Sequence, residues 1–353
     1  MWIAQDGEQD EGCEVVLTFA AEGEARGGLR EVDPGRDLGV VAGLIAQGFA
    51  GDLDSRAQAS LREMRRLARL WPLVGWMAEA DPILRESLSG FVWEEPVPGK
   101  RGLQIVANVS LNPAPGARGW SIICNVVTRP EYRRQGIARQ LTVAAIDAAR
   151  ERGAEGVLLQ VYGANQAACH LYSELGFRDV AGEIDLRLAA PGAVPVADSP
   201  GCAVRRLRAS DGHAALGLAR SVTPEPLQWI VPVRAVDYQP DALTASVQSL
   251  SDTLAGRRTH RLAAFREERL AGVLWLQSVR RGPAHRLSLM VRPEDRGQVE
   301  GALLGRAMSL LVGRALLPVW ATVFQDHAEA IEQLRGLGFE GRRTLLVMKK
   351  ALR

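Results

Sequence analysis

The segment from Arg133 to Arg139 combines residue types that could hold a phosphate. Gly136 follows Arg133 and Arg134, and a helical pattern begins directly after it. Backbone N–H groups at a helix N-terminus bind anions, a glycine lets a phosphate approach the backbone closely, and arginines pair with phosphate oxygens. A plain strand-to-helix turn is the alternative reading. No G-x-x-x-x-G-K-S/T motif of the P-loop type occurs anywhere in the chain.

A second segment, Asn165 to Phe177, carries two further side chains that could do chemistry, Asn165 and Tyr172. Asn165 stands at the start of an expected helix, where Asn is a favoured N-cap. Tyr172 lies within that helix and could equally be a core aromatic. Gly176 is expected to end the helix as a C-cap. The spacing alone leaves both the structural and the functional readings open.

The elements that must position these segments alternate between strands and helices. Strand patterns occur at residues 29–32, 90–94, 103–111, 120–128, 156–161 and 177–188, and helical patterns at 37–51, 56–77, 136–152 and 166–175. This order predicts a central sheet covered by helices on both faces.

The chain also contains a copy of itself. The sequence TRPEYRRQ at 128–135 reappears as VRPEDRGQ at 291–298, and ACHLYSELGF at 168–177 reappears as AIEQLRGLGF at 330–339. Both matches keep nearly the same offset, which indicates tandem copies of one domain. An Ala-, Pro- and Gly-rich stretch separates them. We therefore predict an N-terminal extension at 1–28, a first domain at 29–190, a linker at 191–202 and a second domain at 203–353.

Taken together, these motifs resemble the GCN5-related N-acetyltransferase (GNAT) superfamily. Residues 133–138 meet its signature Q/R-x-x-G-x-G/A, and residues 165–177 meet N-x-x-A-x-x-x-Y followed by L-G-F. The resemblance covers about residues 29–190, and a decayed version covers about 203–350. It implies an α/β (α+β three-layer) fold with two tandem acyl-CoA N-acyltransferase domains, each a mixed central sheet flanked by helices.

The resemblance further implies that the first copy binds acetyl-CoA and transfers its acetyl group. In the family, the strand before the glycine turn separates from its neighbour and binds the pantetheine arm through its backbone, and the turn holds the pyrophosphate. The implied cofactor-binding residues are Val126, Val127, Thr128, Arg134, Gln135, Gly136, Ile137, Ala138, Arg139 and Asn165. Tyr172 is implied as the general acid for the CoA thiolate. Proton transfer from a phenol of pKa about 10 to a thiolate of pKa about 8.5 is uphill by only ~2 kcal/mol.

One departure from the family concerns the general base. Many relatives place a glutamate five residues before the Asn, and this chain has Gln160 there. Glu94 and Glu95 are the nearest substitutes that the sequence offers, although both could be surface carboxylates. The base could also be absent if the acceptor amine is weakly basic.

The other departure is the second copy, in which Val299, His327 and Leu334 replace Gly136, Asn165 and Tyr172. We expect this copy to have lost coenzyme binding and catalysis. It would act as a built-in partner of the first copy, so that the protein is a monomer with an intrachain pseudo-dimer, or a homodimer.

The composition limits which classes of partner and which cellular compartment we expect. The 353 residues carry 43 Lys+Arg against 41 Asp+Glu, a net charge of +2, which gives no support for a nucleic-acid partner. The longest apolar run, 38–51, is too short to span a membrane. Four scattered cysteines without a CxxC pair argue against a metal site and favour a cytoplasmic location.

The expected function is N-acetyl transfer from acetyl-CoA to a primary amine, on a small-molecule or peptide acceptor. An acyl-CoA-binding regulator without turnover is the alternative. Arg62, Arg65, Arg66 and Arg69 lie on one expected helix, as a solvated face or as a hint of an anionic acceptor.

Overall fold

The computed structural model describes residues 27–49, 55–99, 101–191, 201–313 and 316–353. Most of the predicted N-terminal extension and most of the predicted linker lie outside the described residues. We refer below to residues 27–191 as the N-terminal half and to residues 201–353 as the C-terminal half.

Both halves present the same order of elements. The N-terminal half contains strands β1 (Gly28–Glu31), β2 (Gly90–Pro96), β3 (Leu103–Pro113), β4 (Trp120–Thr128), β5 (Gly156–Tyr162) and β6 (Arg178–Leu188), and helices α1 (Pro34–Gly48), α2 (Ser55–Ala80), α3 (Pro82–Ser87), α4 (Ile137–Glu151) and α5 (Gln166–Glu174). The C-terminal half contains strands β7 (Cys202–Arg206), β8 (Arg257–Arg266), β9 (Arg269–Val279), β10 (His285–Val291), β11 (Val319–Phe324) and β12 (Glu340–Ala351), and helices α6 (Gly212–Val222), α7 (Glu225–Ile230), α8 (Ala235–Tyr238), α9 (Ala242–Leu254), α10 (Glu300–Ser309) and α11 (Ala328–Gly336).

The described strands form one continuous 12-stranded mixed sheet in the order β1-β2-β3-β4-β5-β12-β6-β11-β10-β9-β8-β7. The last strand of each half has crossed to the other half. Strand β12 pairs with β5, and β6 pairs with β11, so that Leu345 lies opposite Tyr162 and Val319 opposite Leu188. The order is symmetric about the β12–β6 pair. The sequence did not predict this strand exchange.

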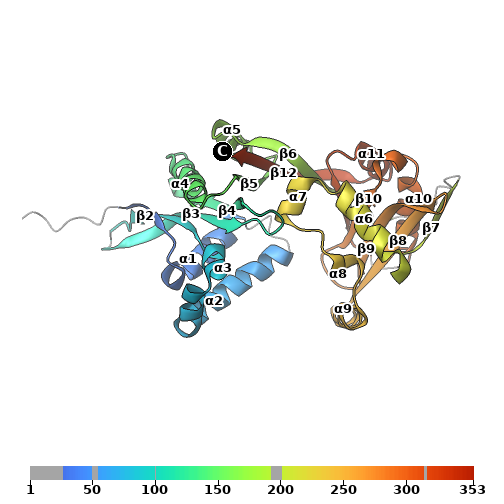
Figure 1. Ribbon diagram of the computed structural model, residues 1–353, viewed down its shortest axis with the longest axis horizontal. Coiled ribbons are helices and arrows are strands. Elements are labelled where there is room, and N and C mark those ends of the chain that lie inside the picture. The colour runs from blue at the N-terminus through green and yellow to red at the C-terminus, as the bar shows by residue number, and fades with distance from the viewer. Residues whose placement is uncertain (1–26, 50–54, 100, 192–200, 314–315) are drawn as a thin grey trace, which may run out of the picture.

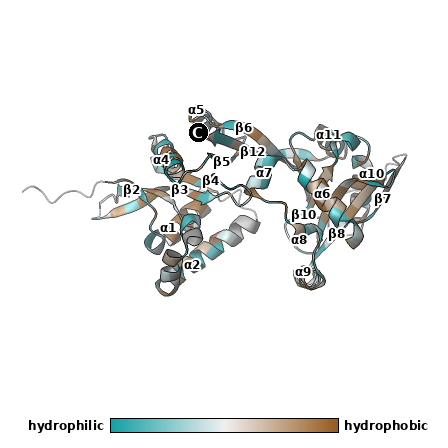
Figure 2. Cartoon of the chain, in the orientation of Figure 1, coloured by the Kyte–Doolittle hydropathy of each residue, from teal (hydrophilic) through white to brown (hydrophobic). Residues whose placement is uncertain are grey.

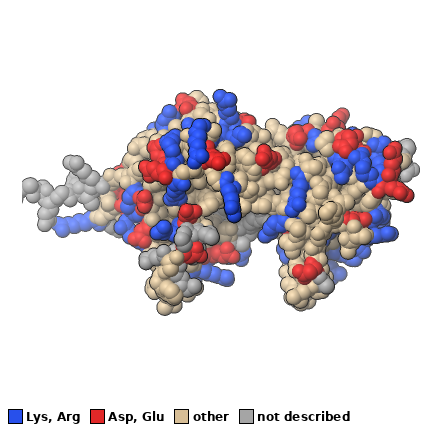
Figure 3. All heavy atoms as spheres, in the orientation of Figure 1, with Lys and Arg blue, Asp and Glu red and all other residues tan. Residues whose placement is uncertain are grey.

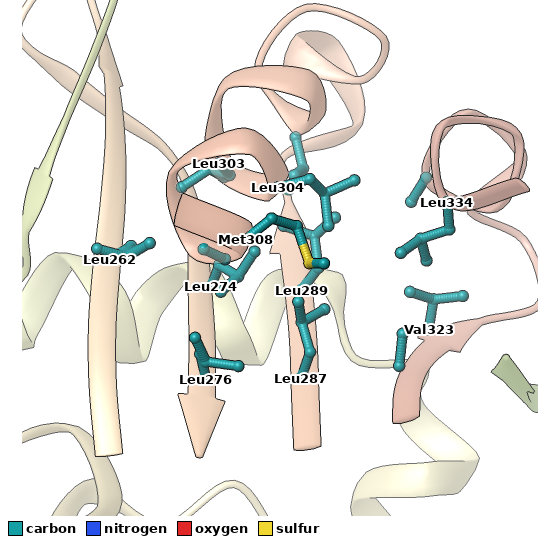
Figure 4. Close-up of a cluster of buried hydrophobic side chains, with 14 of the residues drawn as sticks. Leu262, Leu274, Leu276, Leu287, Leu289, Leu303, Leu304, Met308, Val323 and Leu334 are labelled. Atoms are coloured by element: carbon teal, nitrogen blue, oxygen red, sulfur yellow. The ribbon is translucent and has the colours of Figure 1, made fainter. Parts of the chain in front are cut away.

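Helices cover both faces of the sheet, as expected for this fold class, and Figure 1 shows α4, α5 and α11 on one side of it and α1, α2, α8 and α9 on the other. Apolar side chains are concentrated along the strands (Figure 2). In the C-terminal half, leucines of β8, β9 and β10 pack under α10 and α11 (Figure 4). The mixed α/β architecture predicted from the sequence is therefore confirmed.

Local sequence explains the elements nearest the glycine turn. Strand β4 has the predicted bounds, and β5 is almost entirely buried because parallel strands are covered on both faces. Helix α4 buries Ile137, Leu141 and Ala145 at helical spacing against the sheet. The short helix α3 was not predicted.

Candidate coenzyme and active site

Strands β4 and β5 separate along their length. Their parallel pairing covers Trp120–Ile123 against Gly156–Leu159 and does not continue over the remaining residues of either strand, all of which the structure describes. The backbone of Val126, Val127 and Thr128 therefore faces β5 without a partner strand on that side. This is the opening that the resemblance to the acetyltransferase superfamily implied. Unpaired backbone N–H and C=O groups at such an opening can bind an amide-containing chain.

A β-bulge in β4 shapes the inner end of the opening. The pairing of β3 with β4 shifts register between Asn108 and Ser110, and Asn125 takes a left-handed conformation with φ 53°. The fully buried Asn108 holds the bulge, because its Nδ2 donates to the Asn125 carbonyl oxygen over 3.0 Å. The Asn108 Oδ1 atom is buried and has no hydrogen-bond partner among the described residues.

Sequence reasoning missed Asn108, although a signal existed. An asparagine in the middle of the otherwise apolar run 105–109 is unusual. A buried polar group needs a hydrogen-bonding reason, which here is the bulge beside the unpaired segment of β4.

The glycine turn leaves the N-terminus of α4 open. Arg134 and Gly136 both adopt left-handed backbone conformations, with φ 61° and 80°, and no side chain caps the helix. A Cβ built on Gly136 would meet no atom within 4 Å, so the glycine faces open space. The first N–H groups of an α-helix have no intrahelical partners. Together with the helix dipole, these N–H groups make the turn suitable for binding an anion.

The polar side chains of the turn are exposed and partly engaged. The Arg133 Nε donates to the Thr128 carbonyl oxygen over 3.2 Å, and the Gln135 Nε2 donates to the Glu131 carbonyl oxygen over 3.4 Å. Arg139 forms an exposed ion pair of 2.7 Å with Glu174 of α5. Surface pairs of this kind are weak, so Arg139 can exchange its partner for a phosphate.

Helix α5 positions the two side chains of the second segment. Asn165 caps the helix, because its Oδ1 accepts from the Ala168 N–H over 3.2 Å. Tyr172 is 6% exposed and packs edge to face against Phe177, with ring centroids 5.9 Å apart. Burial, and to a lesser degree the Cys169 thiol, raises the pKa of Tyr172 to about 12. The phenol therefore stays protonated at all ordinary pH values, and proton transfer from it to a thiolate of pKa about 8.5 is uphill by roughly 5 kcal/mol.

Glu94 and Glu95, the two carboxylates considered as general bases, are both engaged in contacts with other side chains. Glu94 pairs with Arg30 at 2.8 Å and with Arg36, and the hydrogen bond from Arg30 is the main cause that lowers the pKa of its carboxyl. Glu95 accepts a 2.7 Å hydrogen bond from the Trp93 indole. A carboxylate held by two guanidinium groups is a poor proton acceptor.

Gln160 and a carboxylate not noticed in the sequence lie on the other side of the opening. Gln160 is exposed on β5. Glu183 lies on β6, opposite Leu345, which in turn lies opposite Tyr162 of β5. Burial, with a further contribution from Asp185, raises the pKa of Glu183 above its ordinary value. Strand β6 also carries Arg178, Asp179, Asp185 and Arg187, so the sequence offered no signal that singled out Glu183.

The corresponding turn in the C-terminal half is filled by the protein itself. Val299 is fully buried where Gly136 is exposed. The buried carboxylate of Glu300 accepts from the Val299 N–H over 3.2 Å and forms a 2.8 Å contact with Nε2 of His327. Burial alone would raise the pKa of Glu300, but hydrogen bonds from His327 and from backbone N–H groups outweigh it and lower the pKa. An internal carboxylate thus takes the place that an anion takes in an open turn.

The third replaced position, Leu334, belongs to the apolar core under α11. Strand β10 also pairs with β9 without the register shift seen in β4. Among the described residues, no group of three or more His, Cys, Asp or Glu side chains could hold a metal ion. No helix within the described ranges has the length and apolar character that a membrane crossing requires.

Comparison with known proteins identifies this arrangement. The model of the acetyltransferase (GNAT) family matches residues 61–177, which include β4, the glycine turn, Asn165 and Tyr172. The N-terminal half therefore contains a match to the GNAT family over residues 61–177. The superfamily resemblance expected from the motifs is thereby confirmed.

Two solved structures extend the GNAT likeness over both halves. A GCN5-related N-acetyltransferase from Sphaerobacter thermophilus aligns with TM-score 0.59 and 18% identity, covering 93% of this chain and 96% of that protein. A tandem GNAT protein from the clavulanic acid biosynthesis pathway aligns with TM-score 0.50 and 18% identity, covering 92% and 98%. At this identity the two structures establish the fold, including its tandem form.

A relative in sequence is the mycothiol acetyltransferase of Thermobispora bispora, which is 32% identical over 158 residues. The alignment covers 42% of this chain and 45% of that protein, so the chain spans less than half the length of this GNAT relative.

Proposed function

We propose that this protein is an N-acetyltransferase that moves an acetyl group from acetyl-CoA to a primary amine, with catalysis in the N-terminal half. The observation that carries the proposal is the β4–β5 opening followed directly by the uncapped α4 N-terminus. In the C-terminal half the equivalent turn is closed by Glu300. This contrast supports a single catalytic half.

The residues of the N-terminal half fit the groups of the coenzyme. Backbone groups of Val126–Thr128 can pair with the amides of the pantetheine arm, and the N–H groups that follow Gly136 can bind the pyrophosphate. Arg134 and Arg139 add positive charge there. The Asn165 amide lies at the N-terminal end of α5. Bound acetyl-CoA supplies the thioester that the amine attacks.

Two groups of the chain would then stabilise the reaction. A backbone N–H near Val127 donates to the oxygen on which negative charge develops. The Tyr172 hydroxyl, kept protonated by burial, donates its proton to the leaving sulfur. The carboxylates Glu94 and Glu95 do not serve as the base in this proposal, because both are engaged with other side chains.

The acceptor class is a small-molecule or peptide amine. The relative named mycothiol acetyltransferase makes a mycothiol-related amine the first candidate to try. Small amino sugars, amino acids and peptide N-termini complete a panel that covers both acceptor types.

The test is amine-dependent release of CoA thiol, compared among the wild type, Tyr172→Phe and Tyr132→Phe. Tyr132 carries a matched hydroxyl in the same half, which accepts from Gln104 over 3.1 Å. We expect Tyr172→Phe to lower kcat by about 10²-fold or more, the usual contribution of a positioned acid, with CoA affinity retained. Tyr132→Phe should keep wild-type turnover.

Two results would overturn the proposal. If CoA binds tightly but no amine accelerates thiol release, the protein is an acyl-CoA-binding regulator. If Gly136→Val binds CoA as tightly as the wild type, the coenzyme does not occupy the turn.

A further inference from the structure

A second pocket lies in the C-terminal half, away from the β4–β5 opening. It has a volume of about 1030 Å³ and is enclosed by α9 and by strands β8 and β9. Pockets that hold small ligands are typically about 300–1,000 Å³, so this one is large enough for an organic molecule.

Helix α9, which forms one wall, is exposed around most of its circumference. Its apolar residues Leu243, Leu250 and Leu254 are 75%, 62% and 81% exposed, and the polar residues Gln248 and Ser251 are exposed as well. The residues of α9 that line the pocket are mostly polar: Gln248, Ser249, Ser251, Asp252 and Thr253, together with Ala245 and Val247. This polar majority suits a polar occupant.

Arginines dominate the charge of this pocket. It is lined by Arg206, Arg257, Arg258, Arg261 and Arg280. The one acidic side chain among the lining residues, Asp252, already pairs with Arg257 at 3.3 Å and accepts a 2.8 Å hydrogen bond from Thr259. The pocket therefore carries an excess of positive charge. This differs from the surface seen in Figure 3, where charges of both signs are interspersed over much of the molecule.

The floor of the pocket contains the Trp275 indole. Trp275 of β9 lies opposite Arg261 of β8, and the Arg261 guanidinium is 5.2 Å from the Trp275 ring centroid. Tyr238 packs against the same indole, with ring centroids 5.0 Å apart. The Trp275 Nε1 atom is buried and does not open into the pocket. The Trp275 ring therefore borders the pocket and lies against Arg261, so that its resonance reports on what this guanidinium binds.

We propose that this pocket binds the phosphate group of a small organic phosphate. The Arg261 guanidinium donates to the phosphate oxygens, and the other arginines of the lining add attraction. The remaining volume, lined by Thr259, Gln277 and the polar residues of α9, holds the organic part through hydrogen bonds.

Indole N–H resonances of the full chain test the proposal. The chain has 8 tryptophans, and the resonance missing from Trp275→Phe identifies Trp275. The probes are inorganic phosphate and glucose 6-phosphate, with sodium chloride at matched ionic strength. We expect a saturable shift of the Trp275 N–H resonance with both probes, because the Arg261 guanidinium lies 5.2 Å from the Trp275 ring, and we expect tighter binding of the sugar phosphate.

Three variants separate this site from the rest of the molecule. Arg261→Gln should weaken binding about tenfold or more, because it removes a charge-assisted hydrogen bond. Arg306→Gln, an exposed arginine of α10 outside the pocket, should bind like the wild type. Gly136→Val, which alters the coenzyme turn, should also keep the shift. An equal shift with chloride, a shift that survives Arg261→Gln, or no saturable shift would each overturn the proposal.

Discussion

Replacing Glu300 by alanine tests whether the C-terminal half closes its own anion site. The carboxylate accepts from the Val299 N–H at 3.2 Å and contacts the His327 imidazole at 2.8 Å, and all three residues are almost fully buried. Alanine leaves a buried N–H and a buried imidazole without this partner. Each such group costs about 1–3 kcal/mol, so the free energy of unfolding should fall by about 2–6 kcal/mol.

The measurement is urea unfolding together with a thermal melt. At about 2–4 °C per kcal/mol for a domain of this size, the loss corresponds to a Tm lower by roughly 4 °C or more. Glu300→Gln keeps the shape and part of the hydrogen bonding, and should lose less stability than Glu300→Ala. Glu332→Ala, an exposed glutamate on α11, is the matched control. If Glu300→Ala were no less stable than Glu332→Ala, the Glu300 contacts would not hold the turn closed.

The remaining predictions concern pH, the coenzyme turn and the exchanged strand. Folding lowers the pKa of Glu300, so the stability that its carboxylate contributes is complete above the ordinary glutamate pKa of about 4.5 and is lost as pH falls through the folded value. The difference in unfolding free energy between the wild type and Glu300→Gln should therefore shrink in acid. Urea unfolding from pH 7 to pH 3 measures this difference. Gly136→Ala should lower the free energy of unfolding by about 1–2 kcal/mol, because the φ of 80° at this position is strained for alanine. Calorimetry should show that the same variant loses more than this amount in the free energy of CoA binding. Deleting residues 340–353 should prevent folding of the N-terminal half as well as the C-terminal half, checked by soluble yield and circular dichroism, because β12 fills the place between β5 and β6.

The sequence predicted those features that local patterns encode. Strand β4 shows a run of apolar residues that ends at a polar turn, and the Gly136 turn follows it directly, so both could be located from neighbouring residues alone. The cap at Asn165 also depends only on the residues of its own helix. The structure adds that Asn165 does cap α5.

Features that depend on contacts between distant residues could not be predicted. The strand exchange is a choice between two nearly equivalent partners for each terminal strand, since β6 and β12 are both long and similar in pattern. The contact of Glu300 with His327 joins two separate helices. The periodicity of α9 predicts an apolar face against the sheet, whereas in the structure its leucines Leu243, Leu250 and Leu254 are largely exposed.

Glu94 shows how the sequence can locate a residue without revealing its surroundings. The sequence placed this glutamate at the end of a strand in the N-terminal half, where a base could be useful. Its neighbours Arg30 and Arg36 come from β1 and α1, which lie far from it in the sequence. Only the folded chain shows that two guanidinium groups surround the carboxylate and lower its pKa.

The strand exchange shows how the C-terminal half, whose turn at Val299 is closed by Glu300, contributes to the structure of the N-terminal half. Strand β12 separates β5 from β6 and contributes Met348 to the core that contains Tyr172. Its Lys350 donates a 2.6 Å hydrogen bond to the Leu175 carbonyl oxygen at the C-terminal end of α5. The helix dipole also stabilises a cation at this end. The helix that carries Tyr172 is therefore held in part by the C-terminal half. Substitutions such as Val299 and Leu334 leave β12 intact, so this half can lose its own chemistry while it completes the sheet on which the proposed catalysis depends.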